Sequence, residues 1–121
     1  MFLIKLDLYI KNNDEEFNYK DIDFKTKNNK YLFSIENDEY EIDLDKLVFH
    51  KKNSESELDF IFDIKNKTTG TYLIKELEFY MDAKVETTKV DRRDKDLDIE
   101  YKLWLQDEYV GEFIFRIKVK E

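Results

Sequence analysis

Apolar and polar residues alternate along most of this chain of 121 residues. In the opening segment, Phe2, Ile4, Leu6, Leu8 and Ile10 occupy every second position. Successive side chains of a β-strand point to opposite faces, so this spacing predicts a strand with one buried face. The period of 3.6 residues that indicates a helix is weak throughout the chain. We therefore expect a protein built almost entirely of β-sheet.

The alternation returns between turn-rich stretches and predicts eight or nine strands in all. Full closure of such a sheet removes the exposed edges that apolar strands would otherwise present. Residues 1–121 are therefore expected to form one domain, a single antiparallel β-barrel of about eight strands. Before the last two strands, the later residues expected to point inward are Ile22, Phe24, Tyr31, Phe33, Ile35, Tyr40, Ile42, Leu44, Leu47, Phe49, Leu58, Phe60, Phe62, Ile64, Tyr72, Ile74, Leu77, Phe79, Met81, Ala83 and Val85.

Charge and apolarity together predict the register of a hairpin spanning residues 46–63. Opposite charges stabilise a sheet when they face each other across strands. Placing His50 opposite Asp59 also stacks Phe49 on Phe60, across a loop of four residues. Both faces of the hairpin then agree on one pairing.

The same reasoning predicts the register of the final hairpin. Setting Gln106 opposite Glu112 pairs Glu100 with Lys118 on the outside. On the inside this register pairs residues 99, 101, 103 and 105 with 119, 117, 115 and 113, so that Leu103 faces Phe115. The hairpin joining residues 77–90 to 97–107 has two registers with equally good charge pairs. Between Ile74 and Leu77 the apolar parity flips, which predicts a bulge or corner.

The net charge of −8, from 29 acidic and 21 basic residues, disfavours nucleic acids and anionic membrane surfaces as partners. The basic pairs Lys51-Lys52 and Arg92-Arg93 are expected to be solvated charges of loops and strand ends. The sequence contains no cysteine, no signal-peptide pattern and no run of 18 apolar residues. We therefore expect a cytoplasmic protein. The lysine-rich, proline-free composition is typical of an AT-rich bacterial genome.

Candidate catalytic and metal-binding residues are few. His50 is the only histidine, and no nucleophile-elbow sequence surrounds the nearby Ser54 and Ser56. Residues 94–100 have the alternating carboxylates of a calcium loop but carry Ile99 where the loop needs glycine. The acids of residues 39–45 are interpreted in the same way, as one polar face of a strand. The sequence predicts no enzyme, no metal and no cofactor.

Four tyrosines, Tyr31, Tyr40, Tyr72 and Tyr101, share the inward face with many phenylalanines and are the candidate ligand-binding residues. A cavity lined by Phe and Tyr can hold a small apolar or aromatic ligand at the mouth of a barrel. An inward set this bulky also favours a filled interior over a large pocket. A cavity of ~300 Å³ or more would support ligand binding, and a filled interior would support a structural or interaction protein.

Apolar residues on the outer face predict a second function class. The register of the last hairpin sets Trp104 against Ile114, with Tyr109 in the turn beside them. Trp, Tyr and Ile together are typical of interface cores, so this surface is a candidate for a homodimer or another protein contact. The alternative is an isolated cross-strand pair that stabilises its own hairpin.

The segments YLFSIENDEYEIDLDKLVFHKK, ELDFIFDI, TTGTYLI, MDAKVETTKV and LDIEYKLWLQDEYVGEFIFRIKVK together resemble the YwiB-like family of small bacterial proteins. The pattern is strongest around Tyr101 and Leu103. This resemblance implies a calycin-type β-barrel, akin to lipocalins, with no established biochemical role. The sequence has Ile74 and Leu77 where the family pattern has threonine and glycine, and it lacks the lipocalin Gly-x-Trp motif.

Overall fold

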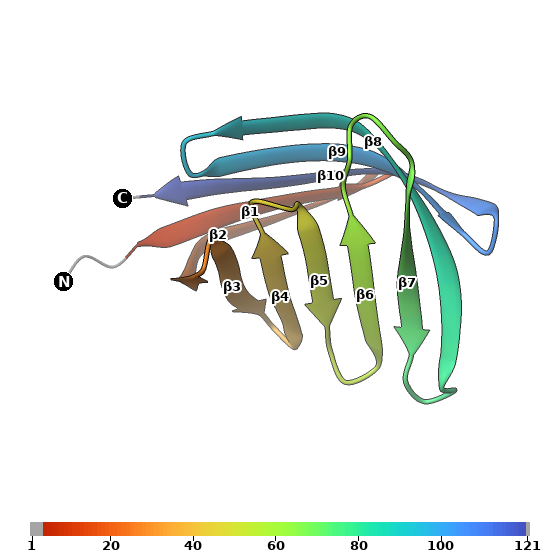
Figure 1. Cartoon of the computed structure of the whole chain (residues 1–121). Helices are drawn as coiled ribbons and strands as arrows, with labels where there is room; N and C mark the ends of the chain where they lie inside the picture. The colour runs from red at the N-terminus through yellow and green to blue at the C-terminus, as the bar shows by residue number, and fades with distance from the viewer. Residues whose placement is uncertain (1–3, 121) are drawn as a thin grey trace.

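The computed structural model describes residues 4–120, and these residues form ten antiparallel strands closed into a barrel (Figure 1). The strands are β1 (Lys5–Asn12), β2 (Glu15–Lys27), β3 (Lys30–Ile35), β4 (Asp38–Asp43), β5 (Val48–Lys52), β6 (Ser56–Ile61), β7 (Thr68–Ile74), β8 (Phe79–Arg93), β9 (Asp96–Leu105) and β10 (Glu108–Lys120). Each strand pairs with the next one in the chain, and β10 pairs with β1 to close the barrel. The predicted all-β barrel is confirmed, with ten strands instead of eight or nine.

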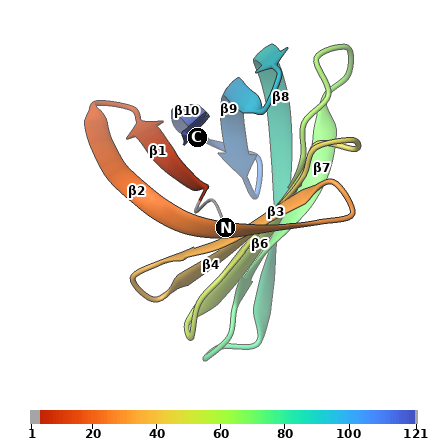
Figure 2. The same ribbon diagram turned by 90° about the vertical axis from the view of Figure 1, so that its left-hand side faces the viewer.

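Two long strands bend and so belong to both sides of the barrel (Figures 1 and 2). β8 pairs with β7 from Phe79, which lies opposite Ile74, to Val85, which lies opposite Thr68. From Ala83 onward β8 also pairs with β9. β2 pairs with β1 along its first part and with β3 only from Phe24 to Lys27. The strands β3–β7 therefore cross under the strands β1, β2 and β8–β10.

The inward face carries the hydrophobic core that the alternation predicts. The buried hydrophobic residues are Leu6, Leu8, Tyr31, Phe33, Ile35, Tyr40, Ile42, Leu44, Phe49, Phe60, Phe62, Ala83, Val85, Leu97, Ile99, Leu103, Phe115 and Ile117. Four residues expected inward are exposed: Ile4 at 39%, Ile64 at 52%, Leu77 at 70% and Phe79 at 47%. Ile64 and Leu77 lie beyond the ends of β6 and β7, where strand alternation no longer fixes the direction of a side chain. Ile4 precedes β1 and Phe79 is the first residue of β8, so both lie at the edge of the core. Phe2 lies outside the described residues.

The two ends of the barrel differ. At one end the Tyr31 hydroxyl donates a hydrogen bond to the Lys95 carbonyl oxygen at 2.9 Å, and Arg92 donates to the Leu44 carbonyl oxygen. These bonds tie β3, the turn after β4 and the β8–β9 hairpin across that end. The other end, which we call the mouth, carries the turns at 13–14, 36–37, 53–55, 75–78 and 106–107.

The predicted register of the β5–β6 hairpin is confirmed. His50 pairs with Asp59 and Phe49 with Phe60. The rings of Phe49 and Phe60 are stacked with centroids 6.3 Å apart. Alternating charges outside and aromatic residues inside select the same pairing, which is why sequence reasoning succeeded here.

The predicted register of the β9–β10 hairpin is wrong by four residues. Phe115 pairs with Ile99, not Leu103, and the observed turn contains only Gln106 and Asp107. Both turn residues have positive φ, at 51° and 65°, as a two-residue hairpin turn of type I′ requires. Because the error is an even number of residues, Leu103 and Phe115 both still point into the core.

A bulge follows this turn and restores the strand pairing. The register shifts between Tyr109 and Gly111, leaving Val110 as the extra residue. Gly111 has φ of +148°, and a Cβ there would lie 2.1 Å from the Asn13 side-chain oxygen. The Asn13 side chain donates to the Val110 carbonyl and accepts from the Glu112 amide. Gly111 therefore leaves room for the Asn13 side chain, which hydrogen-bonds the backbone groups of the bulge.

The β8–β9 hairpin, whose register charge pairing left open, changes register part-way along its length. The pairing shifts by one residue between Thr87 and Lys89, so Thr88 is a bulge and each half of the hairpin follows its own register. The parity flip between Ile74 and Leu77 has a different cause from the predicted bulge or corner. It is the four-residue turn of the β7–β8 hairpin, residues 75–78.

Candidate functional site

A cavity of about 370 Å³ lies inside the mouth of the barrel. Its size exceeds the ~300 Å³ at which ligand pockets begin. Two residues of its lining, Phe17 and Val110, are 38% and 39% exposed, so the cavity is open toward solvent. The lining residues are Ile10, Asn12, Phe17, Tyr19, Asp38, Tyr40, Phe49, Lys51, Leu58, Phe60, Tyr72, Tyr101, Leu103, Leu105, Val110, Phe113, Ile114 and Phe115.

Aromatic rings form the inner wall of this cavity. Tyr101 stacks on Phe113 with ring centroids 5.3 Å apart, and Phe115 meets Phe49 edge-on at 5.2 Å. Tyr40 contacts both Phe49 and Phe115. Ring pairs of this geometry hold one another in place, so the wall is a preformed apolar surface.

The structure brings three of the four candidate tyrosines to the cavity. Tyr40, Tyr72 and Tyr101 line it, whereas Tyr31 lies at the opposite end of the barrel. The Tyr31 hydroxyl is already bonded to the Lys95 carbonyl oxygen, and burial raises the pKa of Tyr31. Parity along the strand placed all four tyrosines inside but carried no information on the end of the barrel at which each would lie.

Tyr40 and Tyr101 line the cavity with unpaired hydroxyls. Neither hydroxyl forms a hydrogen bond with another described residue. Within the described part of the chain, every fully buried side-chain nitrogen or oxygen has a hydrogen-bond partner. These two hydroxyls are therefore not fully buried, and they offer polar contacts to a molecule in the cavity.

The Tyr101 phenol predicts how stability depends on alkaline pH. Burial raises the pKa of Tyr101, and the neighbouring Tyr40 raises it further. In the unfolded chain a phenol ionises at about pH 10. In the folded protein the Tyr101 phenol is still neutral at that pH. Below that pH both states hold the proton, and above it the unfolded state gains stability, so the free energy of unfolding falls.

Tyr101→Phe should therefore show a smaller loss of stability than the wild type as pH rises above about 10. The measurement is urea denaturation at a series of alkaline pH values, followed by circular dichroism. If both proteins lose the same free energy of unfolding over this range, the Tyr101 phenol does not have a raised pKa in the folded state.

Two charged residues, Lys51 and Asp38, also line the cavity. Lys51 pairs with Tyr40 on one side and Leu58 on the other, and all three side chains point inward. Its ammonium lies 5.5 Å from the centre of the Tyr40 ring and 3.6 Å from the Asp38 carboxylate. The side chains of Lys51 and Asp38 are only 28% and 31% exposed.

Sequence reasoning missed this inward ion pair. Lys51 was expected to be a solvated charge, and no acid was expected at an inward position of the registered strands. The signal was present, because Lys51 shares parity with Phe49 and Asp38 shares parity with Tyr40. An inward lysine is unusual, and the confirmed β5–β6 register places it there.

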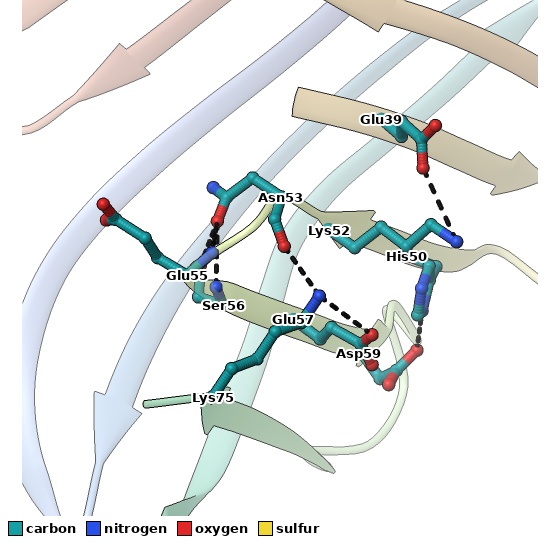
Figure 3. A network of polar contacts seen from close by, with 9 residues as sticks. All are labelled: Glu39, His50, Lys52, Asn53, Glu55, Ser56, Glu57, Asp59 and Lys75. Carbon is teal, nitrogen blue, oxygen red and sulfur yellow. Dashed lines mark hydrogen bonds and ion pairs between the residues drawn. The ribbon is translucent and has the colours of Figure 1, made fainter. Parts of the chain in front are cut away.

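His50 lies on the outer face of the barrel beside Asp59 (Figure 3). Its Nδ1 contacts an Asp59 carboxylate oxygen. The nearby Ser56 hydroxyl contacts Asn53, and no hydrogen bond within residues 4–120 joins His50 to a serine. The described residues thus form a His–Asp pair without the nucleophile that a catalytic triad requires.

His50→Gln is expected to lower the free energy of unfolding by less than ~1 kcal/mol, because partly exposed ion pairs contribute little. Urea denaturation of the two proteins measures the difference. A loss well above that value would mean that the pair is a structural element of the barrel.

Trp104 and Tyr109 form a pair on the outer face of the β9–β10 hairpin. They are direct cross-strand partners, with ring centroids 5.3 Å apart, and the Lys67 ammonium lies 5.3 Å from the centre of the Trp104 ring. Ile114 pairs with Glu100 instead of Trp104. The predicted Trp104–Ile114 pair is therefore wrong, because of the four-residue register error.

Two other hollows carry more charged residues than the cavity does. A hollow of about 520 Å³ is lined largely by charged residues such as Asp98 and Arg116. Another of about 1050 Å³ is lined by a mixture of charged residues, such as Glu41 and Lys52, and apolar residues, such as Ile22 and Phe24. Residues 4–120 contain no group of three or more His, Asp or Glu side chains placed to hold a metal ion. Within the same range, no helix has the length and apolarity needed to cross a bilayer.

Comparison with protein families gives a match over nearly the whole barrel. Residues 8–117 match a family described as "Domain of unknown function (DUF1934)". No curated protein and no solved structure matches the chain. The matched range runs from β1 into β10 and contains every residue that lines the cavity.

Proposed function

The chain belongs to the DUF1934 family, and we propose that it is a non-catalytic protein that binds a small apolar or aromatic molecule in the mouth of its barrel. The observation that carries this proposal is the preformed cavity of about 370 Å³ with its wall of aromatic rings. Pockets for small molecules are typically apolar, concave and supplied with a few polar groups. This cavity has all three properties.

Direct titration with the neutral fluorescent probe N-phenyl-1-naphthylamine tests the proposal. The probe is weakly fluorescent in water and brightens in an apolar site. We expect a saturable increase in its emission with protein concentration, and competition by aliphatic molecules. Emission that does not saturate, or that no competitor reduces, would contradict the proposal.

A second candidate function is self-association through the outer face of β9–β10. The observation that favours it is that Tyr109 is 55% exposed while its ring lies tilted against the ring of Trp104. In this reading the pair forms the centre of a homodimer or of another protein contact. Ile114 lies on the same face of the sheet, beyond the Lys102–Glu112 pair.

Trp104→Lys is the test of this second function. If the Trp104 surface holds a dimer, the substitution should reduce the mass measured by light scattering at equal concentration, while the β-sheet circular dichroism stays unchanged. A wild-type protein that is monomeric at the concentrations used would remove the support for a homodimer.

We also propose that the chain is related to the YwiB-like proteins with a calycin-type barrel, and that it is a cytoplasmic protein of a bacterium. Both proposals are supported by the sequence pattern around Tyr101 and Leu103 and by the net charge and composition of the chain.

A further inference from the structure

The charged groups of the cavity, Lys51 and Asp38, differ in how many hydrogen bonds each can still form with a ligand. Resting on the proposed binding function, we infer that the ligand is an amphiphile with a carboxylate or similar anionic head, and that this head binds Lys51 while the apolar tail occupies the aromatic cavity. The inference depends on the unused hydrogen-bond donors at the mouth.

Lys51 has donors to spare. An ammonium carries three N–H donors and no acceptor, and the Lys51 ammonium forms no hydrogen bond with another described residue. The Lys51 Nζ lies 3.6 Å from Asp38 Oδ2. This distance is longer than the roughly 2.7–2.9 Å of a charge-assisted hydrogen bond. The ammonium is held near the cavity by the Tyr40 ring but is not saturated.

Asp38 has less to offer. One of its carboxylate oxygens accepts a hydrogen bond of 2.8 Å from the Asn53 side chain, and the other faces Lys51. The cavity also contains the Tyr40 and Tyr101 hydroxyls, each able to donate or accept a hydrogen bond. The Lys51 ammonium has free donors, whereas each Asp38 oxygen already faces a donor, and this difference favours an anionic head over a cationic one.

The net charge of −8 does not prevent this binding. Charges separated by more than about 8 Å are largely screened at physiological ionic strength. The nearest acid in the cavity, Asp38, is neutralised in part by Lys51 itself. The local contact with the ammonium then decides the preference.

The test compares three competitors with the same twelve-carbon chain: dodecanoate, dodecanol and dodecyltrimethylammonium. Each displaces N-phenyl-1-naphthylamine from the wild type and from variants, below its micelle concentration. Dodecanoate should bind most tightly to the wild type. Lys51→Met should weaken dodecanoate by about tenfold or more and should weaken dodecanol, which has no anionic head, by much less.

Lys52 provides a matched control. It is the next residue on β5, points outward and pairs with Glu39 at 3.5 Å (Figure 3). Lys52→Met removes the same charge from the protein but should not alter dodecanoate binding. Asp38→Asn should strengthen dodecanoate binding, because it removes the carboxylate that competes for Lys51.

Three results would overturn the inference. Equal weakening by Lys51→Met and Lys52→Met would show a general charge effect without a specific contact. Tighter binding of dodecyltrimethylammonium, weakened by Asp38→Asn, would show a cationic head at Asp38. Binding of the neutral probe without any preference among heads would refute the head contact but keep the proposed function, whereas failure of the neutral probe to bind would refute the proposed function itself.

Discussion

Replacing Phe115 with alanine is expected to lower the free energy of unfolding by about 3–5 kcal/mol. Phe115 is 5% exposed and contacts the rings of Phe49 and Tyr40. Truncation removes a buried ring and leaves a space that the surrounding strands cannot close, because their pairing fixes the distance between them. Domains of this size are stable by only about 5–15 kcal/mol, so the loss is a large share of the total.

Urea denaturation followed by circular dichroism measures this effect, with Phe17→Ala as its control. Phe17 undergoes the same chemical change but is 38% exposed at the rim of the cavity, so the cost there should be at most about 2 kcal/mol. If both variants lose the same free energy of unfolding, Phe115 is not part of a tightly packed core.

The second large effect concerns ligand binding. Leu58→Trp is expected to abolish saturable binding of N-phenyl-1-naphthylamine at the concentrations that saturate the wild type. Leu58 lines the cavity from β6 and is only partly buried, so a larger side chain can extend into the open mouth. The indole then occupies space that the probe needs, and the closely packed rings behind it cannot retreat.

Ile61→Trp is the control for this experiment. It places the same indole on the same strand, but Ile61 points outward and is 45% exposed. Probe binding should remain as in the wild type. Equal loss of binding in both variants, or none in Leu58→Trp, would place the probe outside the cavity. Circular dichroism confirms that each variant is folded.

Sequence reasoning predicted which side of each strand faces the core but not always which residues are paired. Alternation is a property of one strand, so Phe49, Leu103 and Phe115 were assigned inward correctly. Register depends on the turn as well. The β9–β10 turn at Gln106 and Asp107 lacks the glycine that normally signals a two-residue turn, and charge pairing alone favoured a wider loop.

The candidate site was predicted in part. Aromatic residues on the inward face indicated a cavity lined by Phe and Tyr, and Tyr40, Tyr72 and Tyr101 do line one. The position of the opening could not be predicted, because it depends on where β2 turns away from β3. Lys51 was interpreted as solvated because its neighbours in the sequence are polar, although its strand neighbours are apolar.

The most direct test of the central claim is to locate a bound probe by nuclear magnetic resonance. Isotope-edited nuclear Overhauser spectra of the labelled protein with N-phenyl-1-naphthylamine report which side chains lie beside the probe. The cavity predicts contacts from the probe to Leu103, Tyr101 and Phe113, which line its inner wall. Contacts confined to outward residues such as Trp104 and Ile61, with none to the inner wall, would contradict it.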